Sequence, residues 1–183
     1  VKPWQAQVAT DGYRCALRPD EYYWGSPCVL MEKAALLALA ARLDPQGHAW
    51  ALAAARDQWH WILGRNPNAW SLVSRIGRGP TRIYHTEWGK KRVPPPGYLV
   101  DGPNNHDALF LSPKAPAKAL LWYAPMDLPS GVKAGDPWHN DQQDLWAGGF
   151  IPSNTWDTGW WVVTEVDIYY NAALVLAGAL IVP

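Results

Sequence analysis

The chain has 183 residues, 49% of them hydrophobic, and its 16 basic and 16 acidic residues give a formal net charge of zero. This is sufficient for one globular domain with a hydrophobic core. No basic stripe is present to neutralise a row of phosphates, and the longest strongly apolar run, residues 172–182, is too short to span a bilayer. We therefore expect no nucleic acid partner and no membrane partner.

The first predicted helix covers residues 28–43 and is preceded by start signals. Ser26 has the character of an N-cap and Pro27 that of a first helical residue, while Asp44 and Pro45 follow the last turn. The helix is apolar on most sides, which predicts that neighbouring elements cover it.

The second predicted helix covers residues 48–63. Gly64 stands where a residue in the left-handed conformation would end it. A short turn at residues 44–47 joins the two helices, so the pair is predicted to form an antiparallel helical hairpin.

Residues 77–154 differ in composition, because they contain most of the 17 prolines of the chain. We expect one long, loop-rich excursion with a short helix at 115–123. Such a stretch inside a compact domain is normally functional or disordered, and its aromatic residues indicate order. The chain has 13 Trp and 8 Tyr against 2 Phe. Rings of this kind fill a core, or they stack against a polar ligand such as a sugar.

The last predicted helix covers residues 157–181 and contains Glu165. This carboxyl lies four residues after Trp161 and five before Tyr170, so aromatic rings are expected around it. Apolar surroundings disfavour the charged form of a carboxyl. A carboxyl that keeps its proton can serve as a general acid.

Five short motifs in register carry a family resemblance. They are Tyr-Trp-Gly-Ser at 23–26, Ile-Leu-Gly-Arg-Asn-Pro at 62–67, Ser-Leu-Val-Ser at 71–74 with Gly77, Pro-Gly-Tyr-Leu-Val at 96–100 before Gly102, Pro103 and Asn104, and Glu-Val-Asp-Ile-Tyr-Tyr-Asn-Ala at 165–172. In this order the motifs resemble the C-terminal part of glycoside hydrolase family 9, the family of many β-1,4-glucanases. The resemblance extends from about residue 22 to residue 179 and so covers most of the chain.

The resemblance implies an all-α fold, the (α/α)6 barrel, with long aromatic-rich loops that build a cleft at one end. Twelve helices of about 11–12 residues with connections of about 6 need about 210 residues, more than this chain has. The family's water-activating carboxylates belong to an Asp-Ala-Gly-Asp motif in the N-terminal half. Residues 133–136, Lys-Ala-Gly-Asp, match it only in part and in the wrong order. We therefore expect residues 1–183 to be the C-terminal portion of one catalytic domain, with the N-terminal portion as a partner outside this chain.

By motif position, the resemblance makes Glu165 the catalytic general acid of an inverting mechanism. Inverting glycosidases hold the acid and a second carboxylate roughly 6.5–9.5 Å apart to admit a water. Tyr170 stands where the family places a Tyr against the sugar, although a position in the core is its alternative. The expected substrate-binding residues are Tyr170, His85, Glu87, Trp161 and Asp157, the last with an N-cap role as its alternative.

The segment around His85 departs from the family pattern. Residues 84–87 read Tyr-His-Thr-Glu, where the family has Pro-His-His-Arg. Glu87 therefore stands close to the place of an Arg, and a plain surface position is its alternative. An anion in place of a cation would favour a sugar with a protonated amine at C2.

The sequence predicts no cofactor and no defined metal site. One loop could bind a structural calcium through oxygen ligands, and a solvated acidic loop is its alternative. The residues concerned are Asp136, His139, Asp141 and Asp144.

The predicted function is endoglucanase-like hydrolysis of β-1,4-glycosidic bonds in a glucan polysaccharide or oligosaccharide. An exo-acting β-glucosidase or glucosaminidase of the same family is one alternative. A catalytically silent, Trp-rich glycan-binding module is the other. The substrate class favours a secreted or periplasmic location.

Overall fold

The computed structural model describes residues 1–67, 69–80, 83, 94–103 and 165–182. Their helices are α1 (Lys2–Thr10), the short 3-10 helix η1 (Pro19–Glu21), α2 (Ser26–Leu43), α3 (Ala49–Ile62) and α6 (Ile168–Ile181). Outside these helices, the described residues form only isolated β-bridges. The prediction of an all-α fold is confirmed. In this part of the chain no helix combines the length and the apolar character needed to cross a membrane.

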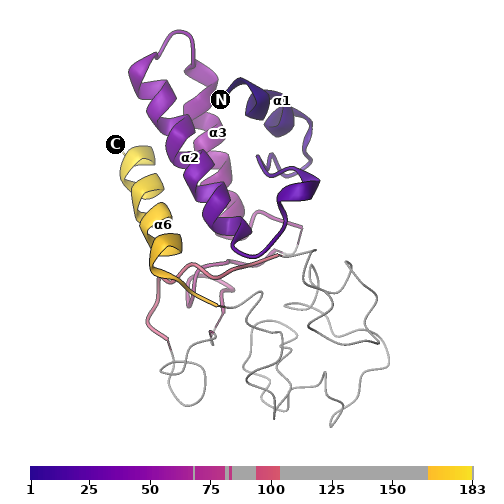
Figure 1. Ribbon diagram of the computed structural model, residues 1–183, viewed down its shortest axis with the longest axis vertical. Helices are drawn as coiled ribbons and strands as arrows, with labels where there is room; N and C mark the ends of the chain where they lie inside the picture. Colours follow the sequence, from indigo (N-terminus) through magenta and orange to yellow (C-terminus); the bar gives the residue numbers. More distant parts are fainter. Residues whose placement is uncertain (68, 81–82, 84–93, 104–164, 183) are drawn as a thin grey trace.

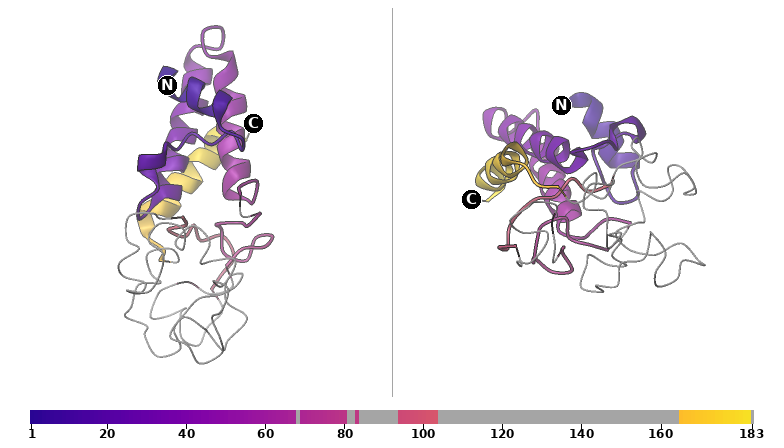
Figure 2. Two further views of the ribbon diagram at one scale, coloured as in Figure 1. Left: turned by 90° about the vertical axis from the view of Figure 1, so that its right-hand side faces the viewer. Right: turned by 60° about the horizontal axis from the view of Figure 1, so that its bottom comes forward.

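The central helix is α2, which packs against α3 and against α6, while α1 lies against α3 (Figures 1 and 2). The start of α2, the end of α3 and the start of α6 lie at the same end of the helices (Figure 1). Residues 94–103 lie at this end, which we call the loop end. The helices thus form a scaffold that holds non-helical segments at one end.

The predicted hairpin of α2 and α3 is confirmed, with one correction at its start. Gly25, at φ +80°, is the N-cap of α2, and Ser26 is already inside the first turn. The hydroxyl of Ser26 instead donates a hydrogen bond of 2.7 Å to the carbonyl of Pro103, so its prediction as N-cap was wrong. Gly64 follows α3 with the positive φ that the sequence predicted, at +119°.

The predicted start of the last helix was also wrong. The helix α6 begins at Ile168 with Asp167 as its N-cap, so Glu165 precedes it. The physical reason is a pairing with a distant segment: Val166 forms an antiparallel bridge with Val100, and the Asp101 N–H donates to the Glu165 carbonyl at 3.0 Å. The rest of the predicted helix, 157–164, and the predicted helix at 115–123 lie outside the described residues.

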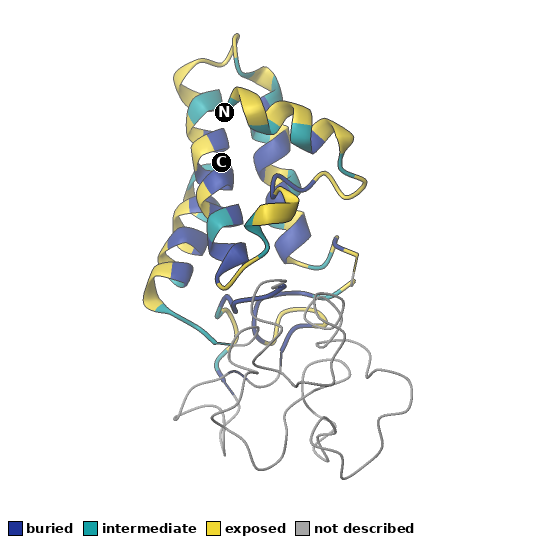
Figure 3. Ribbon diagram, turned by 45° about the vertical axis from the view of Figure 1, so that its right-hand side comes forward, coloured by how far each residue is buried: buried dark blue, intermediate teal, exposed yellow. Residues whose placement is uncertain are grey.

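The hydrophobic core joins the facing sides of α2, α3 and α6 with Val8 of α1 and with buried residues of the connecting segments; buried residues are dark blue in Figure 3. Helices α3 and α6 approach closely at Gly178, where an added Cβ would lie 3.1 Å from the ring of Trp59. The largest fully buried side chains include Leu30, Met31, Leu37, Trp61, Ile62 and Tyr170.

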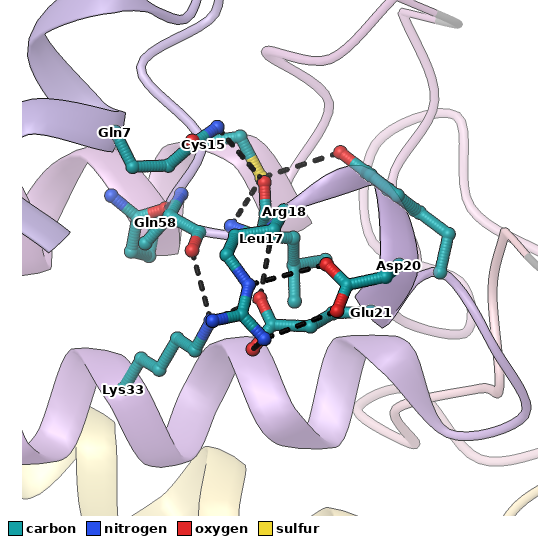
Figure 4. Close-up of polar contacts among 10 residues, drawn as sticks. Gln7, Cys15, Leu17, Arg18, Asp20, Glu21, Lys33 and Gln58 are labelled. Carbon is teal, nitrogen blue, oxygen red and sulfur yellow. Dashed lines mark hydrogen bonds and ion pairs between the residues drawn. The ribbon is translucent and has the colours of Figure 1, made fainter. Parts of the chain in front are cut away.

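A buried polar cluster ties the segment between α1 and α2 to the helices (Figure 4). Lys33 of α2 is 5% exposed; its ammonium forms an ion pair with Glu21 and donates to the Ala16 carbonyl at 2.9 Å. Gln58 of α3 accepts from the Ala16 N–H at 2.8 Å and donates to the carbonyls of Arg14 and Ala54. The sequence did not predict α1, η1 or this cluster.

Candidate active site

The candidate acid, Glu165, lies at the loop end in extended backbone before α6, and its side chain is partly exposed. The antiparallel bridge between Val100 and Val166 places Asp101 directly opposite Glu165. Residues directly opposite in an antiparallel pair project to the same face, with Cβ atoms about 4.5–5.5 Å apart. The fold therefore brings two carboxyls together, although only Glu165 was predicted as a site residue.

The paired segments are held in place from several sides. The Asn171 side chain, in the first turn of α6, accepts from the Leu99 N–H at 3.1 Å and donates to the Asp167 carbonyl at 2.9 Å. On the other side, Val73 bridges Leu99. These bonds fix residues 99–101 between the segment after α3 and the segment before α6, and so fix Asp101 beside Glu165.

The Asp101 side chain is fully buried, at 0% exposure. Burial raises its pKa to about 8; the Glu165 charge adds to the rise, whereas the Tyr170 hydroxyl, the Trp24 indole and the Gly25 backbone oppose it. These three groups lie close enough to favour the charged carboxylate. Even so, within the described part of the chain neither Asp101 oxygen has a partner at hydrogen-bonding distance and angle. The net effect of its surroundings is to disfavour the charged form of the Asp101 carboxyl.

Tyr170, on the first turn of α6, is 1% exposed and covers Asp101. Its ring packs edge-on against Trp24, with centroids 6.4 Å apart, and a Cβ added to Gly25 would lie 3.0 Å from its hydroxyl. Burial, with the nearby Asp101 charge, raises the pKa of Tyr170. The hydroxyl also lacks a hydrogen-bond partner among the described residues. Its contact with a sugar stays a prediction.

The remaining predicted site residues, His85, Glu87, Asp157 and Trp161, lie outside the described residues. The same is true of the four residues of the possible calcium loop, 136–144. In the described ranges no group of three or more His, Cys, Asp or Glu side chains could hold a metal ion. The roles predicted for these residues therefore stay predictions.

Sequence reasoning missed Asp101 and Trp24. A signal was available for Asp101, because it interrupts the matched segment between Val100 and Gly102. Gly102 has φ +68°, and an added Cβ there would lie 2.5 Å from Pro27, so the glycine is required by a close approach to α2. Asp101, next to it, has no such structural requirement and is a candidate for function.

The family is decided by a match over nearly the whole chain. Residues 2–178 match the family model described as glycosyl hydrolase family 9. The chain belongs to this family. The family that the sequence motifs predicted is thereby confirmed, whereas no sequence among the curated proteins matches significantly.

Solved structures of family 9 enzymes are similar to the fold. The crystal structure of the family 9 endoglucanase J30 matches with a TM-score of 0.64 and 25% identity, over 96% of this chain and 28% of that chain. A metagenome-derived family 9 endoglucanase matches with a TM-score of 0.63 and 24% identity, over 97% and 26%. AaCel9A, in complex with cellobiose-like isofagomine, matches with a TM-score of 0.55 and 24% identity, over 96% and 28%. The described helices are therefore part of an (α/α)6 barrel, and the chain spans less than a third of these enzymes.

Proposed function

We propose that this chain supplies the general acid, Glu165, to an inverting glycoside hydrolase that cleaves β-1,4-linked glucan. One observation carries the proposal: Glu165 is partly exposed at the loop end of the barrel helices, opposite a second, buried carboxyl. The family membership and the endoglucanase relatives support the substrate class.

The chemistry assigned to Glu165 is protonation of the departing oxygen. Its extended backbone is fixed by the Asp101 N–H, which donates to the Glu165 carbonyl at 3.0 Å, and its side chain is partly exposed. We assign the second carboxylate, which activates water, to the N-terminal portion of the domain, because residues 133–136 match the family's Asp-Ala-Gly-Asp motif only in part. An inverting pair is separated by roughly 6.5–9.5 Å. Asp101 is fully buried, so we do not assign it this role.

The partner that completes the enzyme is, in this proposal, the N-terminal portion of the same catalytic domain. Helix α6 is apolar around its whole circumference, which is typical of a helix covered on all sides. Nevertheless Ile168, Val175 and Leu176 are 88%, 69% and 53% exposed, and Leu43 of α2 is 76% exposed. The family 9 structures extend over more than three times the length matched here. We infer that the other barrel helices cover these side chains.

The direct test of function is Glu165→Gln in the complete enzyme, meaning this chain together with the remaining barrel. Positioned proton transfer contributes about 10²–10⁴-fold, so turnover of cello-oligosaccharides should fall by that factor. Activated aryl glycosides need less protonation of the leaving group and should lose less. Equal losses on both substrates would contradict the assignment and make Glu165 structural.

A second experiment separates an enzyme from a glycan-binding module. Soluble β-glucan is titrated against Trp fluorescence while reducing ends are measured in parallel. Release that depends on Glu165 supports the hydrolase. Binding without release in the wild-type protein would favour the module.

The inferred partner is tested by expressing residues 1–183 alone. The exposed apolar side chains should make this chain self-associate or bind a dye that recognises apolar surfaces, because exposed patches above a few hundred Å² are rarely tolerated by a monomer. Adding the N-terminal portion should suppress both. A monomer with a cooperative unfolding transition would contradict the inference.

A further inference from the structure

We propose that Asp101 is a positioning residue for the general acid: it lies directly opposite Glu165 and keeps one proton on the two carboxyls, so that Glu165 is supplied with the proton that it donates. The inference rests on the proposed function, since it needs Glu165 to be the acid.

The first argument is register. Val100 and Val166 are paired, and the Asp101 N–H bonds the Glu165 carbonyl at 3.0 Å. Both carboxyls therefore leave the same face of the paired segments, within reach of one another. Like charges directly opposite one another destabilise such a pair, so the arrangement favours a state in which one of the two carboxyls is neutral.

The second argument is burial without compensation. Asp101 is 0% exposed, and its oxygens have no hydrogen-bond partner within the residues that the structure describes. A buried carboxyl normally has partners, and exceptions are concentrated where chemistry needs them. Glu165, by contrast, is partly exposed. The buried carboxyl can therefore act on the exposed one without contacting the substrate itself.

The groups around Asp101 come from three elements. Glu165 faces it from the paired segment, Tyr170 from α6, and Trp24 with Gly25 from the turn before α2. Cys28 of α2 lies near the same carboxyl. Burial is the main reason that its pKa is raised to about 12, the nearby Glu32 is the second, and the Asp101 charge adds to the rise. Tyr170, Trp24, Gly25 and Cys28 are uncharged near neutral pH, whereas Glu32 and Asp167 add negative charge beside Cys28. These acidic groups disfavour full ionisation of the two carboxyls.

Two carboxyls that interact electrostatically, as Glu165 and Asp101 do, lose their protons in two separate steps that belong to the pair. Burial, with the Glu165 charge, raises the pKa of Asp101 to about 8. Between the two steps the pair holds a single proton. It holds that proton through neutral pH, where an isolated carboxyl in water is ionised.

The proton step balances as follows. The shared proton first passes from Asp101 to Glu165, so that an O–H bond of Asp101 breaks and one of Glu165 forms. The O–H bond of Glu165 then breaks, its proton goes to the departing glycosidic oxygen, and both carboxyls are left ionised. Their mutual repulsion favours recovery of one proton from solvent before the next turnover.

The test is the pH profile of kcat/KM on a cello-oligosaccharide for the complete enzyme and for Asp101→Asn. Asn cannot ionise, so Glu165 loses the neighbouring charge and becomes easier to ionise. The alkaline limb should move to lower pH by about one unit, while activity at acid pH stays within about threefold. With the limb near pH 8 in the wild-type enzyme, this is about a twofold loss at pH 7 and approaches tenfold above pH 8. A limb that does not move would overturn the proposal.

The matched control is Asp167→Asn, which removes a partly exposed charge two residues from Glu165. It should move the alkaline limb less than Asp101→Asn does. Equal shifts in the two variants would mean a general charge effect and would overturn the proposal.

A second measurement needs no activity. Infrared titration of the complete enzyme should show a protonated carboxyl at neutral pH that is missing in Asp101→Asn and that ionises at lower pH in Glu165→Gln. If both carboxyls of the pair are ionised at pH 6 in the wild-type enzyme, the proposal is overturned. If the enzyme cleaves no glucan, the proposed function fails, and this titration still decides whether the pair shares a proton.

Discussion

The buried polar groups of this molecule differ between its two ends. Beside α1 and η1, the ammonium of Lys33 and the amide of Gln58 are buried and paired with carbonyls, an N–H and a carboxylate (Figure 4). At the loop end, the Asp101 carboxyl and the Tyr170 hydroxyl are as deeply buried, but they lack hydrogen bonds within the described residues. Paired buried groups stabilise a fold, whereas unpaired ones cost stability and are retained at functional sites. The difference separates a structural cluster from a site.

The largest expected effect is at the structural cluster. Lys33→Ala removes the cation and leaves Glu21 mostly buried without it, which should lower the free energy of unfolding by about 3 kcal/mol. Denaturant unfolding of the complete enzyme measures this loss. The double variant Lys33→Met with Glu21→Gln should lose less, because no unpaired charge remains. If Lys33→Ala lowers the free energy of unfolding by less than about 1 kcal/mol, the ion pair of Lys33 and Glu21 contributes no more than an exposed surface salt bridge.

The next effect is at Gln58, whose amide satisfies three backbone groups. Gln58→Leu keeps the approximate size but leaves the buried Ala16 N–H unpaired, so we expect a loss of about 2 kcal/mol. Gln58→Glu can still accept from that N–H but loses both donated bonds, which makes it an intermediate case. If Gln58→Leu is neutral by denaturant unfolding, the contrast between the two ends fails.

The smallest effect distinguishes two glycines. Gly25 and Gly77 both have positive φ, at +80° and +57°, but only at Gly25 would a Cβ meet another residue, the Tyr170 hydroxyl at 3.0 Å. Both Ala variants should lower the free energy of unfolding by about 1 kcal/mol, because Ala disfavours the left-handed conformation. Gly25→Ala should lower it by about 1 kcal/mol more through overpacking. It should also lower activity, since it displaces Tyr170. Equal losses of stability and unchanged activity would show that Tyr170 has room to move.

Elements with local signals could be predicted from the sequence. Pro27 in the first turn of α2 and Gly64 after α3 act on their own neighbourhood, so the helical hairpin was predicted correctly. The start of α6 was not, because the Asp101 N–H and Val100, far away in the sequence, hold residues 165 and 166 extended. The burial of Asp101 follows from the same long-range pairing. Family motifs pointed to Glu165 but not to the residue opposite it.

The central claim is that Asp101 is retained at a cost in stability because it serves the acid. Its pKa is raised from 3.8 to about 8, so the folded state binds its proton more tightly than the unfolded state. This contribution to stability is fully present below about pH 4 and is lost as the pH rises toward 8. Asp101→Asn lacks it, because Asn does not titrate.

The most direct measurement is the free energy of unfolding of the complete enzyme and of Asp101→Asn at several pH values between 4 and 8. The wild-type enzyme should lose on the order of a few kcal/mol more than the variant over this range. The variant should therefore be the more stable protein at pH 8 and the less active one at neutral pH. Parallel curves for the two proteins would show that Asp101 is ionised in the folded state, and would contradict the account.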